Sequence, residues 1–68
     1  MKSLQEQKNL YLSSIYDEME KRGIQNNDAS RVIGKTGFMS ALEKYPEAQM
    51  HYDVEDAVDE ILLVAATN

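Results

Sequence analysis

The sequence predicts an all-α fold: a compact bundle of three to four helices, with long first and last helices packed against each other and two short ones between. Apolar residues recur at helical spacing near both ends of the chain. Each of these two stretches begins at a residue type that caps helices, and no stretch alternates convincingly with the period of two that a half-buried strand requires. The chain has 68 residues, no internal repeat and no long linker, which predicts one domain over residues 1–68.

The first helix is predicted over residues 3–22. Ser3 is a candidate N-cap, and Gly23 stands where a left-handed C-terminal cap is expected. Glu18 and Arg22 are four residues apart, so they are expected to form an ion pair on the helix surface. The predicted buried stripe consists of Leu4, Tyr11, Ile15 and Met19.

A second, short helix is predicted after a polar turn. Asn27 or Asp28 is the candidate N-cap, because short polar side chains accept hydrogen bonds from the first-turn amides. Gly34 and Gly37 lie close together after this stretch, and they predict a bend in the chain.

A third helical segment is predicted over residues 38–45, where the residues spaced for burial are Phe38, Met39, Ala41, Leu42 and Tyr45. Pro46 ends it, since proline disfavours a helical conformation at the preceding residue. Residues 47–52 are compatible with either a turn of helix or an irregular connection.

The last helix begins with Asp53 as candidate N-cap. Its apolar stripe consists of Val54, Val58, Ile61 and Ala65. Residues 61–66 are all apolar, so this part of the helix is expected to be covered on more than one side. Either it runs through the middle of the domain or a partner chain covers part of it. Six residues are too few to cross a membrane, which takes about 20.

Charge is concentrated in the last helix. Residues 1–52 carry seven acidic and seven basic side chains, whereas residues 53–60 carry five acids and no base, which accounts for the whole net charge of −5. The five acids are Asp53, Glu55, Asp56, Asp59 and Glu60. They form either a solvated helix face or an acidic surface that docks onto a basic partner.

Three features of the sequence resemble parts of chemical sites, and none predicts a catalytic, cofactor or metal site. Residues 29–36 loosely match a phosphate-binding loop, but a helix cap rather than a strand precedes them. Residues 53–64 lack the central glycine and the final glutamate of a calcium-binding loop. His51 is the only histidine and the chain has no cysteine, so no catalytic or metal-ligating set can be assembled from the sequence.

A nucleic-acid-associated regulator is the alternative interpretation. Residues 28–45 combine two short helices and a glycine turn, as a helix-turn-helix unit does, and Arg31, Lys35 and Lys44 lie within them. The acidic net charge and the absence of a basic face disfavour nucleic acid as a partner.

The preferred hypothesis is a small, non-enzymatic protein-interaction module or accessory protein that binds a protein partner or a second copy of itself through its C-terminal helix. The predicted contact residues are the five acids above and an apolar seam of Leu62, Leu63 and Val64. Lys2 is followed by polar residues rather than an apolar run, so the expected location is the cytoplasm, with no membrane contact.

Overall fold

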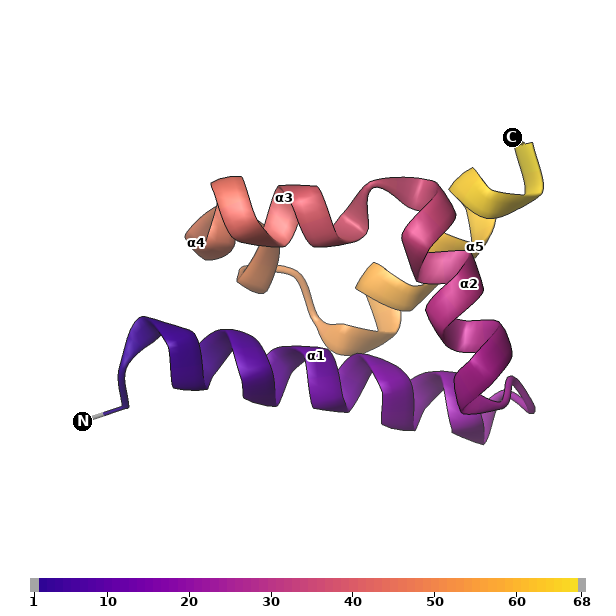
Figure 1. Ribbon diagram of the computed structural model, residues 1–68, viewed down its shortest axis with the longest axis horizontal. Coiled ribbons are helices and arrows are strands. Elements are labelled where there is room, and N and C mark those ends of the chain that lie inside the picture. Colours follow the sequence, from indigo (N-terminus) through magenta and orange to yellow (C-terminus); the bar gives the residue numbers. More distant parts are fainter. Residues whose placement is uncertain (1, 68) are drawn as a thin grey trace.

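The computed structural model describes residues 2–67, and within them the chain forms five helices and no strand (Figure 1). The helices are α1 (Leu4–Lys21), α2 (Asn26–Thr36), α3 (Phe38–Lys44), α4 (Pro46–Met50) and α5 (Val54–Thr67). The predicted all-α bundle is confirmed, and α1 and α5 are its longest helices. The structure has one helix more than the predicted three to four. The additional helix is α4, which covers much of residues 47–52, the stretch that the sequence allows to be either a helical turn or an irregular connection.

Both ends of α1 are set by the predicted capping residues. The Ser3 hydroxyl accepts a hydrogen bond from the Glu6 amide at 3.2 Å. At the other end Gly23 adopts a φ of 87°, and the amides of Gly23 and Ile24 donate to the carbonyls of Glu20 and Met19, each at 2.9 Å. This pair of bonds is a Schellman motif, which satisfies carbonyls that the helix end would otherwise leave without partners.

Helix α2 corrects two predictions. It begins after Gln25 rather than at a cap on Asn27 or Asp28, and the Gln25 carbonyl accepts the first helical bond from Ala29 at 2.8 Å. Ala29 is fully buried, so packing favours a helix that is already established before this residue. Gly34 lies inside α2 instead of at a bend.

The single bend between α2 and α3 is at Gly37. Its φ of 74° lies in the left-handed region, which glycine adopts without the steric cost of a Cβ atom. Pro46 ends α3, as predicted, and also opens α4 as its first residue, where the missing amide hydrogen leaves no hydrogen bond unmade.

Helix α5 forms one wall of the core and packs against α1 and α2 (Figure 1). The largest completely enclosed side chains are Ile15, Met19, Ile33 and Val58. Phe38 of α3 extends the core toward α1, where its ring stacks on that of Tyr11 with centroids 6.3 Å apart. The predicted stripes are thus buried in part. Ile15 and Met19 of α1 and Val58 and Ile61 of α5 are in the core, whereas Leu4, in the first turn of α1, is 45% exposed.

Lys8 is the one charged residue of the described chain that is buried. Its Nζ lies 3.3 Å from a carboxylate oxygen of Glu43 on α3, and its side chain is 11% exposed. The sequence places Lys8 within the apolar stripe of α1, where it looks like an interruption. The ion pair explains how a cation is accommodated there, because a buried charge needs a partner of opposite sign.

Tyr11 fastens the end of α4 to α1. Its hydroxyl lies 3.1 Å from the Gln49 carbonyl and 3.0 Å from the Tyr52 carbonyl, so its single proton is shared between two acceptors. Burial raises the pKa of Tyr11 above its ordinary value of 10.0, the nearby Asp53 carboxylate raises it further, and a side-chain hydrogen bond with Gln49 opposes the shift.

We expect Tyr11→Phe to lower the free energy of unfolding by about 1 kcal/mol, the usual net value of one hydrogen bond. Since folding raises this pKa, the folded state holds the phenolic proton more tightly than the unfolded chain. Wild-type stability is therefore complete below the ordinary pKa and declines as pH rises through the folded pKa. Urea unfolding of both proteins between neutral and alkaline pH should show a gap that narrows at high pH. A gap that stays constant would contradict this role for the hydroxyl.

Candidate partner-binding surface

The acidic residues predicted to bind a partner lie along the solvent-facing side of α5. Asp53 occupies the position before the helix, and its carbonyl accepts the first helical bond from Ala57 at 2.9 Å. Asp53, Glu55, Asp56, Asp59 and Glu60 are all exposed. The acids of the first turn lie at the positive end of the helix dipole, which makes their negative charge favourable for the helix itself.

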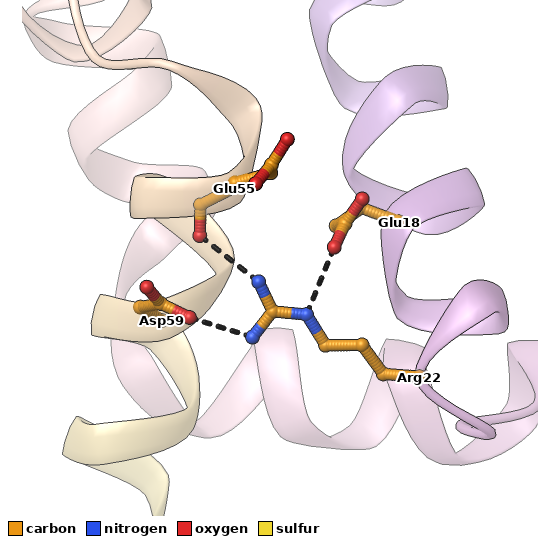
Figure 2. Close-up of polar contacts among 4 residues, drawn as sticks. All are labelled: Glu18, Arg22, Glu55 and Asp59. Atoms are coloured by element: carbon orange, nitrogen blue, oxygen red, sulfur yellow. Dashed lines mark hydrogen bonds and ion pairs between the residues drawn. The ribbon is translucent and has the colours of Figure 1, made fainter.

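Arg22 engages part of this acidic face from within the chain. Figure 2 shows its guanidinium reaching from the end of α1 to α5, where Nη1 lies 2.6 Å from an Asp59 carboxylate oxygen. Nη2 donates to the Glu55 carbonyl at 3.2 Å, and Nε donates to Glu18 at 2.9 Å. The hydrogen bonds to Asp59 and then Glu18 raise the pKa of Arg22, so the guanidinium stays charged. The predicted pair of Glu18 and Arg22 is confirmed, and the same arginine also ties α1 to α5.

A hollow of about 510 Å³ lies between α1 and the start of α5 and is rich in carboxylates. Its lining residues are Ser14, Asp17, Glu18, Lys21, Asp53, Val54, Glu55 and Asp56. The contribution of α1 to this acidic surface was missed at the sequence level. The available signal was helical spacing, because Ser14, Asp17, Glu18 and Lys21 fall on one face of α1.

The predicted apolar seam is divided between the core and the surface. Leu62 is half-buried and packs against the core. Val64 is also half-buried and lines a small cavity of about 70 Å³ together with Phe38 and Ile61. Leu63, by contrast, is 60% exposed. Within residues 61–66 the helix therefore runs along one side of the domain, and Leu63 is the large apolar side chain that it presents to solvent.

Leu63 follows the acidic residues on the same side of the helix. It comes four residues after Asp59 and three after Glu60, and these spacings make side chains neighbours on a helix surface. The outward face of α5, defined here as Asp56, Asp59, Glu60 and Leu63, thus combines negative charge with one exposed leucine.

The other stretches singled out from the sequence lie elsewhere. The Gly34, Lys35 and Thr36 backbone is helical, and the Thr36 hydroxyl donates to the Ile33 carbonyl at 3.0 Å instead of facing an open loop. His51 is exposed at the end of α4.

Within residues 2–67 no group of three potential metal ligands gathers, and no helix in that range is both long and apolar enough to cross a membrane.

The candidate helix-turn-helix stretch, residues 28–45, contains most of α2, the Gly37 bend and α3. Arg31 is exposed and pairs with Asp28 at 3.4 Å, while Glu43 on α3 pairs with Lys8. The exposed positions of α3 carry Met39, Ser40, Glu43 and Lys44, so this helix offers solvent a single cation.

Comparison with protein-family models, curated proteins and solved structures gave no match to this chain.

Proposed function

We propose that this chain is a non-enzymatic protein-interaction module whose outward face of α5 binds a protein partner that carries positive charge. The observation that carries the proposal is Leu63, which is 60% exposed and adjoins two acids on a helix whose opposite side is the domain core. Protein–protein contacts have an apolar centre surrounded by a polar rim. A large exposed apolar side chain with charged neighbours fits that composition.

The charge of this face favours a basic partner over a second copy of the chain. In a symmetric dimer built on the face, the acids of one copy would meet the acids of the other, and opposed like charges weaken association. Arg22 already pairs with Asp59, whereas Asp56 and Glu60 are exposed acids one helical turn apart on the same helix surface. These two carboxylates are therefore the groups that we assign to attracting the partner.

Nucleic acid is the less favoured partner, since the surface of α3 presents one lysine beside a glutamate that is paired with Lys8. Duplex affinity depends on several Lys or Arg contacts to phosphates, and the net charge of −5 opposes such contacts. Titration with random duplex at low salt tests this alternative. Salt-dependent binding that Lys44→Glu abolishes would favour it over the protein partner.

We expect Leu63→Lys to abolish partner binding without unfolding the domain. The side chain is mostly exposed, so its replacement removes little core packing, whereas loss of a central apolar contact typically costs about 2 kcal/mol or more of binding free energy. Immobilised wild-type and variant proteins should be compared for proteins that they retain from the native host. Each retained protein should then be purified and its Kd measured, with sedimentation velocity on the chain alone to detect self-association.

Leu10→Lys is the matched control, because Leu10 is a leucine of similar exposure (50%) on α1, away from this face. It should retain whatever the wild type retains. The double variant Asp56→Asn with Glu60→Gln should bind more weakly and lose part of the salt dependence of binding. Equal binding by wild type and Leu63→Lys, with both folded by circular dichroism, would refute the proposal.

A further inference from the structure

Two exposed tyrosines flank a shallow hollow at the α3–α4 end of the bundle. Tyr45 is 66% exposed and Tyr52 is 58% exposed, and they are the most exposed aromatic residues of the described chain. The hollow has a volume of about 470 Å³. Its lining residues are Ala41, Tyr45, Ala48, Gln49, His51 and Tyr52. The lining is mostly alanine methyl groups and tyrosine rings, which is the kind of surface that receives an apolar side chain.

A second hollow, of about 540 Å³, adjoins the first and is anionic. Gln49 and Tyr52 line both hollows, and the second is completed by Asp56, Ala57 and Glu60. No lysine or arginine of the described chain lines either one. Together they form a groove, here called the tyrosine groove, that is apolar and aromatic at one end and carboxylate-lined at the other.

The two residues shared by both hollows are held in place by hydrogen bonds from α1. Gln49 and Tyr52 are the residues whose carbonyls accept the Tyr11 hydroxyl, at 3.1 and 3.0 Å. The backbone at these two residues is thus attached to α1, the longest helix of the bundle, without any ligand. A groove whose walls are already in place loses less conformational entropy on binding than a mobile one.

We infer that the tyrosine groove binds an extended, basic peptide segment of the partner protein. An apolar residue of the segment lies between Tyr45 and Tyr52, and an arginine or lysine a few residues along reaches Asp56 and Glu60. Charge complementarity supports a basic segment as the occupant, because two carboxylates line the groove and no cation among its lining residues neutralises them. Tyr52 lines both hollows and is 58% exposed, so a guanidinium of the segment can also stack on its ring.

This inference rests on the proposed function and extends it, because Asp56 and Glu60 belong both to the groove and to the outward face of α5. The recognised element of the partner is then an extended basic segment rather than a folded basic surface. An acidic peptide or a phosphate-bearing ligand would meet the same two carboxylates and be repelled.

The test is a titration of the ¹⁵N-labelled protein with short acetylated and amidated peptides that contain one leucine and one arginine at varied spacing. Matched peptides carry citrulline, the neutral analogue of arginine, or glutamate at the arginine position. The arginine peptides should shift the amide resonances of Gln49, Tyr52, Asp56 and Glu60. Their affinity should exceed that of the citrulline peptides by roughly tenfold and fall by roughly tenfold in Tyr52→Ala.

Glu60→Gln, which changes an exposed side chain, is the second variant and should also weaken the arginine peptides selectively. Binding of arginine and citrulline peptides alike, or no shift at millimolar concentration, would overturn the inference. Leu63→Ala distinguishes the two proposals, because it removes the exposed leucine of the outward face without adding a charge beside Glu60, and Leu63 lines neither hollow. It should leave peptide binding unchanged. Peptide binding without a Leu63-dependent partner would refute the proposed function, whereas a Leu63-dependent partner without peptide binding would refute the groove alone.

Discussion

Val58→Asp should leave the domain unfolded at room temperature. Val58 lies in the second turn of α5 with no solvent exposure, packed in the core together with Ile15 and Met19. A carboxylate in that position would have no partner, and an uncompensated buried charge costs about 3–5 kcal/mol in addition to the lost apolar burial. A chain of 68 residues has a total stability of roughly 3–10 kcal/mol at the usual 0.05–0.15 kcal/mol per residue.

Far-UV circular dichroism and thermal unfolding measure this directly. The variant should lose its helical signal and its cooperative transition. Leu63→Asp is the control, since it places the same carboxylate on the same helix at an exposed position and should change the free energy of unfolding by about 1 kcal/mol at most. A folded Val58→Asp protein with a transition near that of the wild type would show that α5 does not form the core wall described above.

The helix ends were predictable where a local sequence signal coincides with the structure. Ser3, Gly23 and Pro46 each act within a few residues, through a side-chain acceptor, a left-handed backbone or a missing amide. Helix α2 shows where such signals fail. Asn27 and Asp28 are residue types that often cap helices. Burial of Ala29 and Ile33 nevertheless favours a helix that begins earlier and continues through Gly34. Tertiary packing outweighs the cost of about 1 kcal/mol for glycine in a helix interior.

The contacts that join helices could not be predicted from the sequence. Arg22 and Asp59 are 37 residues apart, and Lys8 and Glu43 are 35 residues apart. With seven bases and twelve acids in the chain, many pairings are equally consistent with composition. The choice among them follows from which residues of α5 and α3 the tertiary fold brings next to α1. For the same reason the sequence identified the acids of α5 but not the acidic residues that α1 adds beside them.

The tyrosine groove was also hidden, because its residues come from α3, α4, the turn after α4 and α5. Helical spacing made Tyr45 a candidate for burial, whereas the structure leaves it mostly exposed. Pro46 is the physical reason, since it ends α3 at the preceding residue and turns Tyr45 into a non-helical position with φ of −132° and ψ of 60°. The exposed Tyr45 ring is one of the features that support a binding role for the tyrosine groove.

Helix α5 faces two ways, with Val58 in the core and Leu63 toward solvent. The chain contains no cysteine, so Val58→Cys and Leu63→Cys each introduce a single thiol whose reaction with a maleimide reports its accessibility. Both substitutions replace one apolar side chain by a smaller, weakly polar one, which keeps the domain folded.

The decisive measurement is the labelling rate of these two variants under native conditions, relative to each in denaturant. We expect Leu63→Cys to react within a few fold of its denatured rate. Val58→Cys should be slowed on the order of a hundredfold or more, because it reacts only when the domain opens. Similar protection at both positions would mean that residues 61–66 are ordinary core, and similar exposure would mean that α5 is not docked. Neither result is compatible with a helix that has one side in the core and the other in solvent.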